Sequence, residues 1–273
     1  EVDAAPMNSE GQGARSDLDG VDAYGFPWAH AGRAPDVEDS ETEYQFLRLF
    51  YRLRRDNGGF GLFRGGAGSE VALAPRHVPS MPWNQRSRNA KITCALGLFG
   101  GYPSSASFGI HVRGTDLWEK MARGDGDIPD NSVALATERT ISGEYLFEHP
   151  SRSKRTGMNG DIIVHLAGGG GGFGDVLKRD PNRVIDDLKS GLISGWTANN
   201  VYQIRYDPQS LEVDEEATRT ARSDERQKRL ERGKPWQDFI GDWGRFKPPE
   251  QALAYFGSWP EGTPDADKTR QWS

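Results

Sequence analysis

A glycine run at residues 168–175 is the sequence feature that most directly suggests a chemical role. It follows a strand-like segment at residues 161–166, and a glycine loop after a strand can bring several backbone N–H groups close to a phosphate. The glycines also match the G-x-G-x-x-G spacing of dinucleotide-binding loops, at Gly169, Gly171 and Gly174.

The surroundings of the run argue against a nucleotide site. No helix begins at its last glycine, because the expected helix start at Asp180 and Pro181 comes later. No acidic residue that could bind a ribose lies between Leu188 and Tyr206, and the chain has no Gly-Lys-Ser/Thr. The sequence therefore favours a close crossing of backbones at which no side chain fits, with nucleotide binding by this loop alone as the alternative.

Arg64, between Phe63 and Gly65, is a second candidate, because glycine leaves a guanidinium accessible to an anion. The alternative, which we favour, is an ion pair with a carboxylate such as Asp56. The five histidines form no metal motif, since none lies two or four residues from another. No Ser-His-Asp signature is readable either. The sequence therefore predicts no metal site built from this chain alone.

The single cysteine, Cys94, lies in the apolar run 92–99, which predicts a buried strand and a small buried side chain. One cysteine forms no internal disulfide, which fits a reducing compartment. The run is too short to span a bilayer, and no signal peptide opens the chain. We therefore expect a cytoplasmic protein with no membrane contact.

The composition disfavours a nucleic-acid partner. The net charge is −6, and the one strongly charged run, at residues 219–232, mixes arginine with acidic residues. Glycine accounts for 34 of 273 residues, the mean hydropathy is −0.72, and there are eight tryptophans. This combination suits a chain that wraps around partners.

The expected elements predict an α+β fold with a β-rich body, glycine-rich loops, a few helices near the C-terminus and extended terminal arms. Residues 1–40 are expected to be a loop-rich segment, residues 41–210 the body, and residues 211–273 a charged helix with an aromatic arm. We expect strands at residues 44–55, 70–74, 92–99, 108–112 and 161–166, and helices at residues 116–122, 180–191 and 214–232.

Residues 233–273 hold four of the eight tryptophans, together with prolines that rule out a long helix. Large aromatics on an extended, proline-stiffened segment suit a binding arm, and we expect Trp236 or Trp243 to be buried on another subunit. The alternative is a tail that folds back on its own domain.

Three stretches together resemble the hydantoinase B/oxoprolinase family, in its C-terminal portion. They are Gly13-Ala14-Arg15 with residues 19–23, residues 53–68, and residues 168–188. The chain departs from the family pattern at Asn57, where serine is usual, and at Val176, where proline is usual.

The resemblance implies a subunit, or split portion, of a heteromeric ATP-dependent ketone carboxylase of the acetophenone/acetone type. It implies ATP and a divalent metal on partner subunits, including an ATP-binding hydantoinase A-like subunit, with a small ketone and bicarbonate as substrates. The resemblance implies that this chain is inactive by itself and forms part of the wall of the reaction chamber. The alternatives are a subunit of a hydantoinase/oxoprolinase-type cyclic amide hydrolase and a non-catalytic scaffold. The candidate chamber-lining residues are Arg64, Gly169, Gly170, Gly171, Phe173 and Asp175.

Overall fold

The computed structural model describes residues 9–26, 29–30, 36–85, 93–148, 153–243 and 245–246. The chain divides into two compact units, Glu1–Glu225 and Arg226–Ser273, and each is described by itself. The boundaries expected at residues 40 and 210 remain a prediction.

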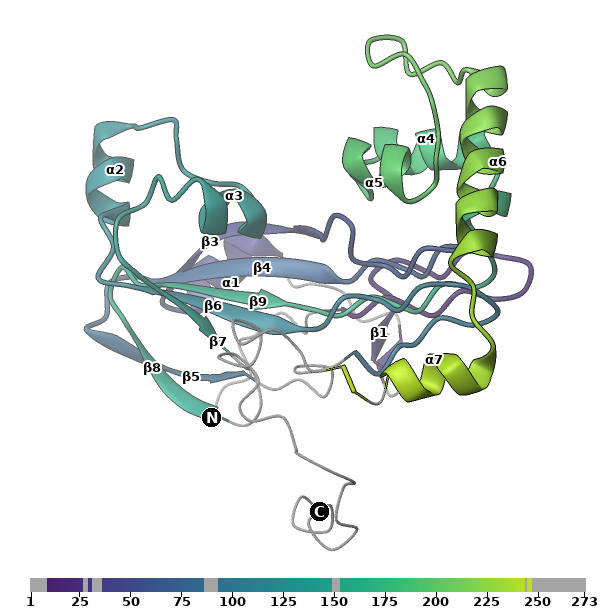
Figure 1. Ribbon diagram of the computed structural model, residues 1–273. Coiled ribbons are helices and arrows are strands. Elements are labelled where there is room, and N and C mark those ends of the chain that lie inside the picture. The colour runs from purple at the N-terminus through teal and green to yellow at the C-terminus, as the bar shows by residue number, and fades with distance from the viewer. Residues whose placement is uncertain are drawn as a thin grey trace, which may run out of the picture. The chain divides into compact units, whose positions relative to one another are not determined.

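An antiparallel five-stranded sheet forms the body of the first unit, in the order β3-β4-β9-β6-β7 (Figure 1). The sheet and the helices around it confirm the expected α+β class. The strands are β3 (Phe46–Leu53), β4 (Ser69–Pro75), β6 (Phe108–Arg113), β7 (Glu144–Glu148) and β9 (Ile162–Leu166).

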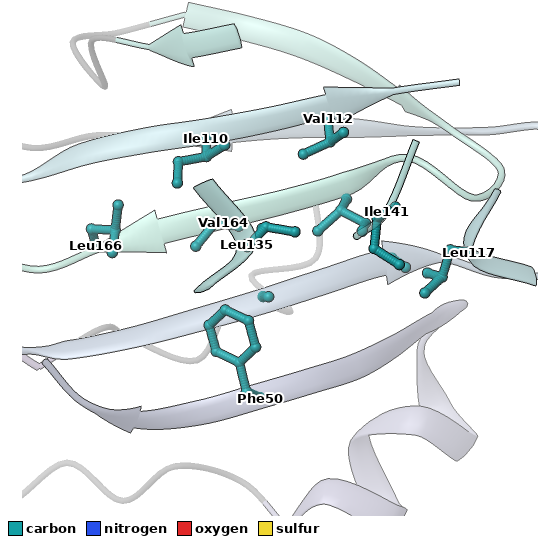
Figure 2. Close-up of a cluster of buried hydrophobic side chains, with 11 residues drawn as sticks. Phe50, Ile110, Val112, Leu117, Leu135, Ile141, Val164 and Leu166 are labelled. Carbon is teal, nitrogen blue, oxygen red and sulfur yellow. The ribbon is translucent and has the colours of Figure 1, made fainter. Parts of the chain in front are cut away.

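One face of this sheet carries the main core. Every second side chain of the inner strands points to that face, where α2 (Leu117–Arg123) and α3 (Ser132–Thr137) cover it. Figure 2 shows the labelled members of this core, which are Phe50, Ile110, Val112, Leu117, Leu135, Ile141, Val164 and Leu166.

The opposite face carries a smaller cluster around Phe46, Val71 and Leu73. A bulge between Arg48 and Phe50 reverses the alternation along β3, so Phe46 and Phe50 are buried in different clusters. The shorter elements of the first unit are β1 (Gly25–Phe26), β2 (Ala29–His30), α1 (Val37–Glu43), β5 (Ser80–Gln85) and β8 (Ser153–Met158).

A second core lies under the helices that follow the glycine run. The expected helix start is confirmed, because the Asp180 side chain accepts the Asn182 N–H and Pro181 takes the first helical position. Val184, Ile185 and Tyr202 are buried in this core. The helices are η1 (Val176–Lys178), α4 (Pro181–Lys189), α5 (Gly195–Asn200) and α6 (Glu215–Glu231), which continues into the second unit.

The buried strand expected at residues 92–99 is wrong for the described part, residues 93–99. This stretch is irregular, because its backbone bonds to the glycine run while its apolar side chains stay outside. Cys94, expected to be buried, is exposed.

Residues 1–40 are expected to be loop-rich, and α1 begins near their end, where the Asp36 carboxylate accepts the N–H groups of Glu38 and Asp39. One further local expectation is corrected. The described part of the arm forms a helix, α7 (Trp236–Trp243), which Pro235 precedes without interrupting. Residues 247–273, with Trp259 and Trp272, lie outside the described residues. In the part of the chain that is described, no helix has the length and apolar character to cross a bilayer.

Candidate functional site: a glycine layer closed by buried arginines

The glycine run after β9 is bonded to other loops through its backbone. The N–H groups of Gly170, Gly172, Phe173 and Gly174 donate to the carbonyls of Gly66, Tyr102, Phe63 and Leu98, over 2.9–3.0 Å. These amides are used inside the protein, so they do not form the open set of donors that a phosphate-binding loop needs. Figure 1 shows the loops running together beyond the ends of β4 and β9.

The same loops touch backbone to backbone. A Cβ atom on Gly170 would lie 1.9 Å from the Gln12 carbonyl oxygen, and one on Gly65 would lie 1.9 Å from the Gly170 oxygen. A Cβ on Gly172 would lie 2.2 Å from the Phe60 oxygen. No side chain fits at these distances, which confirms the expected close crossing. We call the assembly of residues 10–20, 57–68, 95–104 and 168–174 the glycine layer.

A network of buried arginines and buried or partly buried aspartates closes one edge of this layer. The Arg64 guanidinium donates to Asp22, with Nη1–Oδ1 at 2.8 Å, and to Asp187, with Nε–Oδ1 at 3.2 Å. The Arg179 guanidinium donates to Asp19, with Nη1–Oδ1 at 2.7 Å, and to Asp187, with Nη2–Oδ2 at 2.7 Å. Asp187 therefore bridges two arginines that are only 5% and 1% exposed.

The network joins three parts of the chain that are distant in sequence. Asp19 also accepts the Arg64 backbone N–H at 2.7 Å, and Asp22 accepts the Ala67 N–H at 2.7 Å. Arg183 donates to Asp19 at 2.9 Å. The N-terminal segment, the loop before β4 and α4 are thus held together by charge-assisted hydrogen bonds.

The ionised forms of this network are mutually stabilised. Burial raises the pKa of Asp19, but the hydrogen bond and charge of Arg179 outweigh it, so this pKa lies below its ordinary value. Burial lowers the pKa of Arg64, but the hydrogen bond to Asp22 and the charge of Asp187 outweigh it and raise this pKa.

Arg64 is therefore an ion-paired residue, as the favoured alternative predicted, but its partners are Asp22 and Asp187. Asp56, named as an example partner, instead accepts the Ser194 N–H at 2.9 Å. Long-range partners of this kind leave no local signal. Asp19, Asp22, Arg179 and Asp187 were not singled out, although each falls within the stretches that carry the family resemblance.

The other candidate residues lie in or beside the layer. Gly169, Gly170 and Gly171 are buried, and Phe173 packs its ring against Phe99 with centroids 5.1 Å apart. Asp175 caps η1 by accepting the Leu177 N–H at 3.0 Å. The run is thus held in one place, while a chamber-lining role for these residues remains a prediction.

Two histidines of the sheet are held in structural environments. His111 contacts Asp161, with Nε2–Oδ2 at 3.0 Å, and Asp161 also accepts the N–H groups of Gly114 and Met158. Burial and the charge of Arg54 lower the pKa of His165 to about 4, so this ring is neutral near pH 7. Within the described ranges, no group of three His, Cys, Asp or Glu side chains is placed to hold a metal ion.

Comparison with known proteins gives a family match. The family model described as hydantoinase B/oxoprolinase matches residues 3–176. The acetophenone carboxylase delta subunit of Aromatoleum aromaticum (strain DSM 19018 / LMG 30748 / EbN1) is 38% identical over 259 residues, which is 94% of this chain and 38% of that protein.

Two solved structures are also similar. A nucleotide-free acetone carboxylase, from work on ATP-dependent acetone carboxylation, has a TM-score of 0.74 at 26% identity, over 86% of this chain and 32% of the other. An ATP-dependent caprolactamase from Pseudomonas jessenii has a TM-score of 0.60 at 25% identity, over 80% of this chain and 33% of the other. The chain thus spans about a third of the length of these relatives, at 38%, 32% and 33%.

Gly170→Ala is expected to destabilise the protein by more than about 4 kcal/mol, or to prevent folding, because backbone atoms cannot move aside as a flexible side chain can. Thermal unfolding and soluble yield measure the effect. The control is Gly126→Ala, where a Cβ would meet nothing within 4 Å, and its expected change is below about 1 kcal/mol. Equal behaviour of the two variants would contradict a backbone-packed layer.

Asp19→Asn is expected to cost about 3 kcal/mol near neutral pH, because it removes one of the two carboxylates that pair with the buried Arg179 and leaves that guanidinium with Asp187 alone. The pKa of Asp19 in the folded protein lies below its unfolded value of about 3.9. Its contribution is therefore present above that pH and is lost as the pH falls through the folded pKa.

Urea unfolding at neutral and acid pH measures this dependence. The variant is expected to lose less stability on acidification than the wild type. Exposed Asp17→Asn is the control, with an expected change within about 0.5 kcal/mol. An unchanged acid dependence in the Asp19 variant would show that this carboxylate does not stabilise the fold as an anion.

Proposed function

The chain belongs to the hydantoinase B/oxoprolinase family, and on that premise we propose that it is a portion of a heteromeric, ATP-dependent ketone carboxylase of the acetophenone/acetone type. The observation that carries the proposal is the 38% identity to the acetophenone carboxylase delta subunit over 94% of the chain. The likeness to the acetone carboxylase structure, at a TM-score of 0.74, supports the same reaction class.

The role assigned to this chain is architectural. The carboxylates of the network are bonded to arginines and His111 is bonded to Asp161, so these donors do not fit a metal or nucleotide site. ATP and a divalent metal belong, in this proposal, to partner subunits that include a hydantoinase A-like chain. A layer whose segments contact backbone to backbone suits a wall that keeps phosphorylated intermediates away from water. Its lining would include Arg64, Gly169, Gly170, Gly171, Phe173 and Asp175.

The second candidate function is ATP-dependent hydrolysis of a cyclic amide. The caprolactamase structure, similar at a TM-score of 0.60, favours it. A non-catalytic scaffold is the third candidate, because the buried network and the glycine layer serve folding whether or not a substrate is nearby.

An assay of the complex that copurifies with this chain separates these functions. We expect acetophenone or acetone to stimulate ATP hydrolysis and labelled bicarbonate to enter the product, with no activity from this chain alone. Hydrolysis of caprolactam or oxoproline with ATP and without bicarbonate would favour the amide hydrolase. Full activity of a reassembled complex that lacks this chain would favour the scaffold.

The aromatic stripe of α7 is the proposed contact of the arm with another subunit. Trp236, Phe239, Trp243 and Phe246 stack in series, with ring centroids 5.9–6.0 Å apart, and are 45–66% exposed. The spacing of Trp236, Phe239 and Trp243 places them along one side of the helix, and Phe246 continues the stack beyond its end. Exposed aromatics at such density are typical of binding hot spots.

Replacing both Trp236 and Trp243 by Ser is expected to weaken assembly by about 30-fold or more, as for loss of interface hot spots. The melting temperature of the first unit should stay unchanged. Sedimentation of the reconstituted complex measures the affinity, and exposed Gln237→Ala on the same helix is the control. An affinity equal to that of the wild type would show that the arm does not bind a subunit.

A further inference from the structure

The loop at residues 95–102 places a cluster of apolar side chains in solvent. Leu96, Leu98, Phe99 and Tyr102 are 68%, 57%, 81% and 43% exposed. The loop folds back on itself, because the Gly101 N–H donates to the Leu98 carbonyl at 3.0 Å. Its side chains therefore come from a single tight turn, which we call the apolar turn.

The backbone of this turn is held firmly by the glycine layer. The Leu98 N–H donates to the Gly172 carbonyl at 2.9 Å, and the Tyr102 N–H donates to the Phe60 carbonyl at 2.7 Å. A Cβ on Gly97 would lie 1.9 Å from the Gly101 oxygen. The backbone of the turn is thus fixed while its side chains face outward, as in a preorganised binding surface.

Phe99 adopts a backbone conformation that a bulky residue rarely takes. Its φ is +52°, in the left-handed region, where a side chain costs free energy that glycine avoids. The strain places an aromatic ring at the surface, with a ring contact to Phe173 but 81% of the residue exposed. Strain of this kind persists where the surroundings or a function require it.

The turn lies inside residues 3–176, the part that the family model matches. The relatives carry this part within chains about three times as long, since it and the rest of this chain cover 38%, 32% and 33% of them. Clustered exposed apolar side chains mark surfaces that contact another part of a protein or assembly. The additional sequence of the relatives is the candidate for that contact here.

We propose that the apolar turn docks onto hydantoinase B-type sequence that lies outside residues 1–273. Leu98 and Phe99 are the anchors, and Tyr102 is the amphipathic edge of the contact. The proposal rests on the family membership and the assembly in the proposed function, but not on the reaction. A complex that hydrolyses amides would leave it intact.

Site-specific crosslinking tests the occupant directly. The photoreactive residue p-benzoyl-phenylalanine replaces Phe99 in the complex purified through a tag on this chain, and crosslinked peptides are sequenced. Val133, 62% exposed on α3, is the matched control position. We expect crosslinks from position 99, and not from position 133, to peptides that match the hydantoinase B family outside the region equivalent to this chain. Crosslinks to a second copy of the chain, to a hydantoinase A-like subunit, or to nothing would overturn the proposal.

Phe99→Gly tests the energetic role of the ring without a backbone penalty, because glycine accepts a positive φ. We expect the affinity for the rest of the complex to fall by about 10-fold or more, while the melting temperature of the chain stays within about 3 °C. Val133→Ala should change neither quantity. Undiminished assembly of the Phe99 variant would sink the proposal, even if the carboxylase assay succeeds.

Discussion

Direct contact between backbones is the constraint on which the rest of this structure depends. In the glycine layer, segments from four regions of the chain approach so closely that a Cβ on Gly11, Gly65 or Gly170 would lie within 2 Å of a carbonyl atom. Backbone hydrogen bonds between the segments hold them together at these glycines. The same contacts satisfy backbone groups that burial would otherwise leave unpaired, which is why the layer can sit inside a protein.

Where glycines contact backbone to backbone, little apolar surface is buried, so other interactions must hold the layer in register. The sheet and its core support one end, through strands β4 and β9 that lead directly into the layer. The arginine–aspartate network holds the edge at α4. Asp187 on α4 meets Arg64 in the layer, and Arg179 meets Asp19 near the N-terminal segment. Separating a buried ion pair leaves an uncompensated charge, so the network disfavours any register of the layer that would part these residues.

The arrangement explains why a conspicuous glycine run carries no evident chemistry of its own. The N–H groups of residues 170 and 172–174 donate to carbonyls of neighbouring loops, and the arginines and aspartates nearby are paired with each other. The layer exposes apolar side chains on its outer side. A structural role of this kind fits a family in which this region is about a third of a longer chain, at 38%, 32% and 33% of the relatives.

Patterns that are local in sequence were sufficient to predict α4 with its Asp180 cap, strand β9 and the close glycine crossing, because capping, alternation and the absence of a Cβ are written in neighbouring residues. The partners of Arg64 were not predictable, since Asp22 and Asp187 lie 42 and 123 residues away. The buried strand predicted at residues 93–99 was wrong for a related reason. The apolar composition indicates burial, but the backbone of this stretch bonds to the glycine layer and its large apolar side chains are exposed. Only the tertiary structure decides such cases, because backbone contacts between distant segments depend on geometry that side-chain periodicity does not record.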